Sequence, residues 1–481
     1  MGAGIAQVGL TAGLNVVLHD VAPQASAKAK SEIAARLNRM VAKGQLTPER
    51  QADAERRLTL AGSLADLRQA DIVIEAIVER LEPKRALLRE LEAVVSPQCI
   101  LATNTSSLSV AAIGAQCTHK DRICGLHFFN PVPIMNLVEV ITTPDTSRRV
   151  VESALALAKA LGKTPVTVKD GPGFLVNLGG RAFVTEGLHI AQEGVADFAT
   201  IDRIMREAVG FRMGPFELMD LTGIDVNFPV ATFIYEGLQH DPRLKTTTLH
   251  ASMYNSGRFG RKVGRGYYSY DVAPTSLAET AAEAGSPHQD VCIALPEATA
   301  ELTTFCQQHN LHVWHNAKLS LVAPLGEDAS TVAARLAIAP SKLVAIDLIG
   351  IDRKVVTLMT PVGSDRLALR TLADCLRTRG LRVEVIADSP GFVAQRILAM
   401  IANLGCEMAQ TGVGTPEDID LAMRLALNYP LGPLEFADTI GPKKIHSILT
   451  AMQSVTGSDR YRPSLWLRRR ALLARPIHER D

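Results

Sequence analysis

The stretch Asn15-Val-Val-Leu-His-Asp20 reads as a buried strand that ends in an acidic residue. An Ala- and Gly-rich helical segment over residues 2–12, closed by Gly13, precedes it. A helix followed by a strand with a terminal carboxylate is typical of a dinucleotide-binding βαβ unit, in which that carboxylate binds the adenosine ribose hydroxyls. Its charge also repels the extra phosphate of NADP. Asp20 therefore favours NAD, although a helix cap or turn acid explains this residue equally well.

The glycine-rich loop of such a unit is incomplete in this chain. A G-x-G-x-x-G loop needs a strand before it and two glycines before the helix. The chain begins at Met1-Gly2, so that only Gly2 and the nearby Gly4 remain. Absence of the central first strand leaves its neighbours unpaired and removes N–H groups that bind the pyrophosphate. We expect either a truncated chain or a start codon placed too late.

Further along the chain, apolar runs alternate with a helical pattern, which predicts a parallel sheet. Residues 71–79 read as one continuous strand, residues 84–91 as a helix and residues 99–102 as another strand. Ligands bind at the carboxyl ends of the strands in such sheets. Polar side chains near these ends are candidate cofactor or substrate contacts, and each also suits a cap or a solvated charge: Glu79, Lys84, Asn104 and Ser106.

The stretch Gly125-Leu-His-Phe-Phe-Asn-Pro-Val-Pro133 and the strand over residues 136–141 bring together groups that can move a proton. Imidazole titrates near pH ~6.5, so His127 can accept a substrate proton at neutral pH. A histidine beside two phenylalanines is more often a packed core residue. However, the two prolines predict a rigid turn that presents His127 and Asn130, and Glu139 lies on a return strand. Glu139 can then orient the imidazole and make it a stronger base.

The composition argues against several classes of protein. With 51 Lys and Arg residues against 50 Asp and Glu, the formal net charge is +1, which gives no indication of a nucleic-acid or membrane-surface partner. No apolar run approaches the ~18 residues that are needed to span a bilayer. The seven cysteines are scattered and lack C-x-x-C spacing. This pattern fits a reducing cytoplasm and neither a disulfide framework nor a metal site.

Taken together, these motifs resemble those of the NAD-dependent 3-hydroxyacyl-CoA dehydrogenases, and the resemblance runs nearly continuously from residue 1 to about residue 271. It implies a Rossmann-like α/β domain, here without its first strand, followed by an all-α C-terminal domain. The motifs occur in the family's order: Met1-Gly-Ala-Gly-Ile-Ala6, Ile74-Glu-Ala-Ile-Val-Glu79, Asn104-Thr-Ser-Ser107, residues 125–133, Gly171-Pro-Gly-Phe-Leu-Val-Asn177 and Gly214-Pro-Phe-Glu-Leu218.

The resemblance implies that the protein oxidises a (3S)-3-hydroxyacyl-CoA to the 3-oxoacyl-CoA with NAD and without a metal. His127 is then the general base and Glu139 its orienting partner. The implied substrate contacts are Ser106, Asn130 and Asn177. The implied cofactor contacts are Gly2, Asp20, Glu79, Lys84 and Asn104.

The long form of the chain resembles the type found in phenylacetate degradation. This likeness implies 3-hydroxyadipyl-CoA as substrate, with 3-hydroxybutyryl-CoA as the near alternative. Two positions depart from the family. This chain has Asn136 where relatives commonly have Lys, and Leu178 where they commonly have Arg. Contacts to the acyl chain or to coenzyme A can therefore differ here.

The segment after residue 170 recurs later at a constant offset of 218, as for Gly391 minus Gly173, which indicates duplication of a helical module. Long helices are expected over residues 177–193 and 200–208, and again over residues 395–410 and 415–427. The matching pairs include Asp202 with Asp420, Gly214 with Gly432, Pro215 with Pro433, Glu217 with Glu435, Asp220 with Asp438 and Gly223 with Gly441.

Extended backward, the same offset tests whether the candidate site was duplicated. It places Ala345, Leu348 and Thr357 at the positions of His127, Asn130 and Glu139. The intervening segment still reads as α/β, with strands expected over residues 342–347, 354–359 and 381–386. We therefore expect a degenerate, non-catalytic relative of the first α/β domain.

Four domains follow: an NAD-binding domain over residues 1–169, a helical domain over 170–271, a degenerate α/β domain over 289–387 and a second helical copy over 388–481. Residues 272–288, rich in Ala, Pro and Ser, are expected to be a linker. The stretch from Gly257 to Gly266 is expected to be a flexible basic loop. Its cations can meet the phosphates of coenzyme A or simply be solvated.

A cytoplasmic dehydrogenase with an acyl-CoA partner, and with neither nucleic-acid nor membrane partners, is the leading hypothesis. The missing first strand motivates an alternative, a truncated or non-catalytic acyl-CoA- or NAD-binding protein of the same fold. The helical modules can pair inside one chain or across subunits, so both a monomer and a homodimer stay open.

Overall fold

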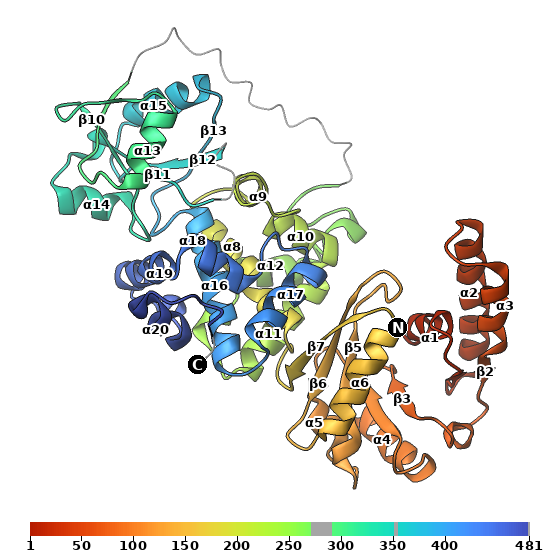
Figure 1. Ribbon diagram of the computed structural model, residues 1–481. Coiled ribbons are helices and arrows are strands. Elements are labelled where there is room, and N and C mark those ends of the chain that lie inside the picture. Colours follow the sequence, from red (N-terminus) through yellow and green to blue (C-terminus); the bar gives the residue numbers. More distant parts are fainter. Residues whose placement is uncertain (271–290, 351–354, 480–481) are drawn as a thin grey trace. The chain divides into compact units, whose positions relative to one another are not determined.

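The computed structural model describes residues 1–270, 291–350 and 355–479 (Figure 1). The chain forms two compact units. Met1–Leu178 and Thr411–Leu427 make up the first unit, and Gly179–Gln410 with Asn428–Asp481 the second. The linker expected over residues 272–288 lies outside the described residues.

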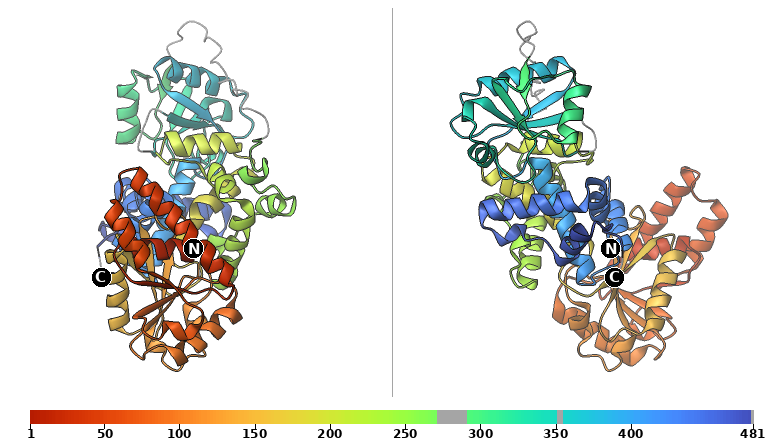
Figure 2. Two further views of the ribbon diagram at one scale, coloured as in Figure 1. Left: turned by 90° about the vertical axis from the view of Figure 1, so that its right-hand side faces the viewer. Right: turned by 60° about the vertical axis from the view of Figure 1, so that its left-hand side comes forward.

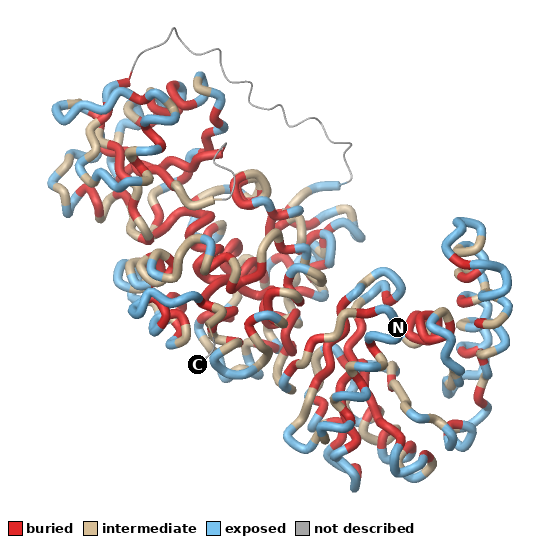
Figure 3. Tube along the Cα trace, in the orientation of Figure 1, coloured by how far each residue is buried: buried red, intermediate tan, exposed pale blue. Residues whose placement is uncertain are grey.

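A five-stranded sheet with the order β3-β4-β5-β6-β7 forms the centre of the first unit. β3, β4 and β5 are parallel, whereas β6 runs antiparallel to β5 and parallel to β7. The middle strands are almost entirely buried because apolar residues occupy both of their faces (Figure 3). The strands span Ile72–Glu75, Ile100–Thr103, Ile123–Phe128, Leu137–Thr142 and Thr164–Lys169.

Helices α4 (Leu81–Val94), α5 (Val110–Gly114) and α6 (Arg148–Ala160) pack on this sheet. The amphipathic helix α6 contacts β5, β6 and β7 through a buried apolar stripe that recurs every four residues, made by Val150, Ala154 and Ala158. The helix expected over residues 84–91 is confirmed within α4.

β1 (Val16–Leu18) and β2 (Leu58–Leu60) form a separate parallel pair, with no ladder to the five-stranded sheet among the described residues. Among the described residues, β1 and β3 each have one edge without a strand partner. Val17 is 41% exposed, so the prediction of a buried strand was wrong. Figure 2 shows α2 (Pro23–Ala42) and α3 (Pro48–Arg56) side by side next to this pair.

The second unit contains a six-stranded sheet with the order β13-β12-β11-β10-β8-β9. Helices α13 (Ala300–Gln308), α14 (Ala329–Leu336) and α15 (Leu367–Thr378) surround it (Figure 2). The predicted strands are confirmed as β11, β12 and β13. The six strands, in numerical order, span Cys292–Ala294, His312–Val313, Leu319–Val322, Leu343–Asp347, Val355–Met359 and Arg382–Val385.

Two helical modules follow the two sheets in the sequence. In the first, the helix expected over residues 177–193 is interrupted, giving α7 (Val176–Gly179) and α8 (Arg181–Gln192), and then α9 (Phe198–Glu207). In the second, α16 (Val393–Gln410) is continuous and α17 (Pro416–Leu427) follows it. The remaining helices are α10 (Pro215–Thr222), α11 (Ile224–Gly237), α12 (Thr248–Asn255), α18 (Pro433–Ile440), α19 (Pro442–Thr456) and α20 (Leu465–Leu473).

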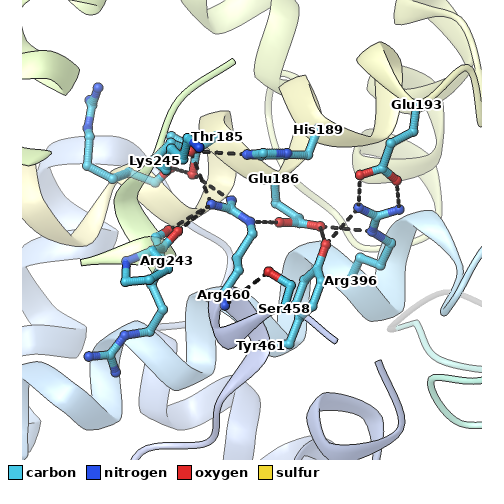
Figure 4. A network of polar contacts seen from close by, with 12 residues as sticks. Thr185, Glu186, His189, Glu193, Arg243, Lys245, Arg396, Ser458, Arg460 and Tyr461 are labelled. Atoms are coloured by element: carbon cyan, nitrogen blue, oxygen red, sulfur yellow. Dashed lines mark hydrogen bonds and ion pairs between the residues drawn. The ribbon is translucent and has the colours of Figure 1, made fainter. Parts of the chain in front are cut away.

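A buried ionic network joins the two helical modules (Figure 4). Glu186 on α8 is fully buried, and its two oxygens each lie 2.8 Å from the Nε of an arginine of the second module, Arg396 or Arg460. Tyr461 also donates a hydrogen bond to Glu186. Burial opposes ionisation of Glu186, but the two guanidinium groups prevail and lower its pKa to about 2. The helical modules therefore pair inside one chain.

The basic loop from Gly257 to Gly266 is anchored at Gly260 and Gly266, whereas its cations are exposed. A Cβ on Gly266 would lie 2.0 Å from Asp220 Oδ1, so that only glycine fits there. Asp220 also accepts hydrogen bonds from the backbone N–H groups of Tyr267 and Tyr268. Lys262 forms an ion pair with Asp225. The loop closes the first helical module.

Candidate active site

His127 and Glu139 lie directly opposite each other on the antiparallel strands β5 and β6. His127 Nδ1 is 2.6 Å from Glu139 Oε2, and the two side chains are 7% and 1% exposed. The imidazole packs against Phe129 and Phe174, with ring centroids 4.5 Å and 6.0 Å away. Because Nδ1 is engaged by the carboxylate, Nε2 is the ring nitrogen that is left to meet a substrate.

Glu139 is itself held by the backbone that follows β7. Its Oε1 accepts hydrogen bonds from the N–H groups of Leu175 at 3.0 Å and Val176 at 2.8 Å. The preceding residues Gly173 and Phe174 both have positive φ, 78° and 49°, which makes the sharp turn that aims these donors at the carboxylate. The Gly171–Asn177 motif therefore fixes the partner of the histidine.

A second carboxylate organises the loop after β4. Glu79 Oε1 accepts hydrogen bonds from the Thr105 hydroxyl at 2.6 Å and from the Ser106 N–H at 2.8 Å. Its Oε2 lies 3.3 Å from Lys84 Nζ. Burial favours the neutral acid, but the hydrogen bonds and the lysine outweigh it and lower the pKa of Glu79. This carboxylate thus orders the loop that carries Ser106.

Lys84, a predicted cofactor contact, is buried in the structure and pairs with two carboxylates. The side chain is 1% exposed and forms a 2.7 Å ion pair with Glu75, which is also buried. Glu75 further accepts hydrogen bonds from the Ile77 N–H and the Thr103 hydroxyl. The Ile77 bond turns the chain after Glu75, so β3 ends there and does not run on to residue 79. Lys84 also forms an ion pair with Glu79 and so helps to hold that carboxylate in place.

The predicted cofactor contact Asn104 and the predicted substrate contacts lie around the histidine strand. Asn104 is buried, and its Oδ1 accepts a hydrogen bond from the Phe128 N–H, next to His127. Asn177 Nδ2 donates to the Ser106 carbonyl at 3.4 Å, which brings together two predicted substrate contacts. Asn130 is exposed in the turn after β5. Asn104 is thus buried beside the histidine strand, whereas Ser106 and Asn130 are exposed.

The ends of α1, β1 and β3 fit a dinucleotide. The helix α1 (Gly2–Thr11) begins at Gly2, and its first N–H groups have no preceding helical turn whose carbonyls could accept their hydrogen bonds. Asp20 is exposed after β1, although its Oδ1 also accepts the Ala22 N–H, as expected for a turn acid. Val21 and Val78 are 93% and 61% exposed, apolar surface that a flat ring can cover. These groups suit the pyrophosphate, ribose and ring parts of NAD.

The second sheet has a different residue at the place of the histidine. Asp347 lies opposite Thr357, as His127 lies opposite Glu139. The constant offset had placed Ala345 there. The short helical turn that precedes β5 in the first copy and β11 in the second begins 220 positions later in the second copy (Pro340 minus Lys120). The next strand, β6 in the first copy and β12 in the second, begins only 218 positions later. The intervening connection is therefore two residues shorter, and a constant offset fails across it.

Asp347 is 5% exposed, and its Oδ1 accepts hydrogen bonds from the Ile349 N–H and from Gln395 Nε2. Burial raises the pKa of Asp347 to about 7. Gln395 stands at the offset position of Asn177. With threonine in place of the orienting glutamate, the second sheet lacks a histidine–glutamate pair.

The fold and the site define a dinucleotide-binding dehydrogenase with a buried histidine–glutamate pair. The model of the 3-hydroxyacyl-CoA dehydrogenase NAD-binding domain matches residues 1–171, and that of the C-terminal domain matches residues 173–270 and again 391–476. The chain belongs to the 3-hydroxyacyl-CoA dehydrogenase family. It is an NAD-dependent enzyme whose substrate is an acyl-CoA.

Similar proteins extend the match over nearly the whole chain. The 3-hydroxyadipyl-CoA dehydrogenase of Escherichia coli K12 is 37% identical over 475 residues, covering 98% of this chain and 96% of its own. A crystal structure of a 3-hydroxybutyryl-CoA dehydrogenase from E. coli K12 superposes with a TM-score of 0.88 at 37% identity, with coverage of 98% and 96%. The human mitochondrial hydroxyacyl-coenzyme A dehydrogenase is 39% identical over 277 residues, 56% of this chain and 88% of its own.

Several residues that shape the site were not identified from the sequence. Glu75 lies inside a recognised motif, but its pairing with Lys84 depends on a helix nine residues away. The amides of Leu175 and Val176 carry no side-chain signal at all. None of the helices in the described part of the chain has the length and hydropathy to span a bilayer, and those residues contain no cluster of potential metal ligands.

Proposed function

We propose that His127 is the general base of this dehydrogenase and that Glu139 orients it. The observation that carries the proposal is the 2.6 Å contact between His127 Nδ1 and Glu139 Oε2, which leaves Nε2 for the substrate. Nε2 accepts the proton of the substrate's 3-hydroxyl group, and the carboxylate stabilises the imidazolium that forms. When bound, NAD supplies the acceptor for the hydride from C3.

The substrate-facing groups in this proposal are Ser106, Asn130 and Asn177. Ser106 is exposed, and both its N–H and its hydroxyl donate to Glu79, at 2.8 Å and 3.3 Å, so that its hydroxyl oxygen can accept a hydrogen bond from a substrate. Asn177 already contacts the same loop. Around the cofactor, Gly2 contributes the start of α1, and Asp20 contributes a carboxylate for the ribose. Glu79, Lys84 and Asn104 are the other proposed cofactor contacts, and Glu79 orders the loop that carries Ser106.

Our proposed substrate is 3-hydroxyadipyl-CoA, with 3-hydroxybutyryl-CoA as the alternative. The support is the E. coli 3-hydroxyadipyl-CoA dehydrogenase, which matches both helical modules and not only the first half of the chain. The human relative covers 56% of this chain. The alternative is supported by the name of the E. coli crystal structure.

Steady-state NADH formation from the two (3S)-acyl-CoA substrates, measured side by side, tests this choice. We expect the larger kcat/KM for 3-hydroxyadipyl-CoA. A larger value for 3-hydroxybutyryl-CoA overturns the substrate choice but leaves the reaction class in place. Inactivity toward both substrates, with NAD bound, contradicts the proposed function.

We further propose a cytoplasmic enzyme, on the basis of the scattered cysteines. A homodimer also stays a proposal. Because α8 already packs against α16 inside one chain, a monomer is the alternative to the homodimer. Light scattering on the purified enzyme distinguishes the two states by mass.

A further inference from the structure

The second helical module contributes residues to the sheet that carries His127. The N–H of Lys169, at the end of β7, donates a hydrogen bond to the Val413 carbonyl at 3.0 Å. Helix α17, which follows, contacts β6 and β7 in the same compact unit. A segment from the far end of the sequence is thus built into the catalytic unit.

The same kind of contact occurs in the other direction, between the second sheet and the first helical module. The Ala387 N–H, at the end of β13, donates to the Val195 carbonyl at 2.9 Å, and α9 contacts β12. Both donors and both acceptors differ by 218 positions (387 minus 169, and 413 minus 195). Each helical module therefore supports the sheet of the other copy.

Gly414 is the point of closest approach in this contact. A Cβ on Gly414 would lie 2.7 Å from Leu175 Cδ1, closer than packed carbon atoms allow, and 3.5 Å from Ile419 Cγ1. Gly414 is not among the positive-φ glycines, so its backbone accepts any residue. Only the neighbouring Leu175 requires a glycine here, and Leu175 is fully buried and has little room to move.

Leu175 connects this contact to the catalytic pair. Its N–H donates to Glu139 Oε1 at 3.0 Å, and Glu139 Oε2 contacts His127 at 2.6 Å. The offset position in the first copy is Ala196, whose module supports the sheet in which Thr357 replaces Glu139. Of these two matching positions, the one without a side chain is Gly414, which belongs to the module that packs against the sheet with the histidine–glutamate pair.

We propose that Gly414 is a positioning residue for the active site, which lets Leu175 seat its amide against Glu139. This inference rests on the proposed roles of His127 and Glu139. A methyl group at position 414 displaces Leu175, shifts Glu139 and misorients the imidazole. Small displacements of catalytic groups reduce turnover much more than they reduce binding.

The test is Gly414→Ala in the full chain, with turnover expressed per NAD-binding site so that unfolded molecules are not counted. We expect kcat to fall by ~10-fold to ~100-fold, with the Kd for NAD within about twofold, since the cofactor groups are untouched. Gly62→Ala is the matched control. Gly62 lies in the same unit, and its Cβ would meet only Asp66 Oδ2, at 3.8 Å.

A shape rescue separates positioning from general damage. Leu175→Val shortens the side chain that the new methyl group would meet, and in the Gly414→Ala background it should restore most of the lost kcat. Wild-type kcat in Gly414→Ala, or a loss that Leu175→Val does not relieve, overturns the inference. If His127→Gln loses activity while Gly414→Ala keeps full activity, only the positioning role of Gly414 is refuted. If His127→Gln keeps full activity, the proposed function itself is refuted.

Discussion

Glu139 engages His127 with one oxygen and the backbone of the Gly171–Asn177 motif with the other, so that a single carboxylate connects the base to a rigid turn. Both oxygens are needed as acceptors. A glutamine has only one acceptor atom and cannot serve both sides.

Glu139→Gln should therefore lower kcat by about 10²-fold or more, because the imidazole loses its orientation. NADH formation under saturating substrate measures the effect. Glu152→Gln, an exposed carboxylate on α6, is the control and should retain wild-type activity. Near-normal kcat in Glu139→Gln would show that the backbone alone positions the histidine.

Lys84→Met should destabilise the first unit. The substitution leaves Glu75 buried without its ion-pair partner, at a cost of about 3–5 kcal/mol. The apparent free energy of unfolding in urea provides the measurement, and Lys159→Met on the exposed face of α6 provides the control. A loss below about 1 kcal/mol would mean that Thr103 and Ile77 suffice to hold Glu75.

Asp347→Asn should stabilise the second unit at neutral and higher pH. The pKa of Asp347 is raised by burial from 3.8 to about 7, so the folded state holds a proton that the unfolded state releases. The contribution of this group to stability therefore declines as the pH rises from about 4 to about 7. The gain from Asn should be about 1.5 kcal/mol at pH 5 and reach up to about 4 kcal/mol at pH 8.

Thermal unfolding of both proteins at these two pH values checks this sign. NADH formation should be unchanged in Asp347→Asn, because the second sheet has no histidine–glutamate pair. A larger stabilisation at pH 5 than at pH 8 contradicts the assignment.

Glu186→Gln should weaken the packing between the two helical modules and lower the free energy of unfolding. It leaves Arg396 and Arg460 buried without a counter-charge, at a cost of about 3–5 kcal/mol at pH 7. The folded pKa of about 2 lies below the ordinary 4.5, so the stabilisation is complete above pH 4.5 and is lost as the pH falls toward 2. The difference between the proteins should shrink below pH 4.5. Glu193→Gln, at the exposed end of the network, should cost less.

Much of the fold could be predicted from local patterns. The strand–turn–strand around His127, the helices of both modules and the strands of the second sheet follow from periodicity and turn residues. The pairing of His127 with Glu139 was predictable because a return strand brings them opposite each other. Val17 was misjudged, since an apolar strand without its neighbour stays half exposed.

What the sequence concealed depends on contacts between distant segments. The Leu175 amide that binds Glu139 is a backbone group, and the Val413 carbonyl reaches β7 from more than half the chain away. Asp347 was missed because a two-residue deletion breaks the register, which only the strand pairing reveals. The burial of Lys84 was not foreseen because a lysine at the start of a helix is normally exposed.

The steady-state rate of NADH formation by His127→Gln, together with its Kd for NAD, tests the proposed catalytic role of His127 most directly. We expect kcat to fall by about 10²-fold to 10⁴-fold, with NAD affinity close to that of the wild type. A variant that binds NAD and still turns over near the wild-type rate would show that another group takes the hydroxyl proton.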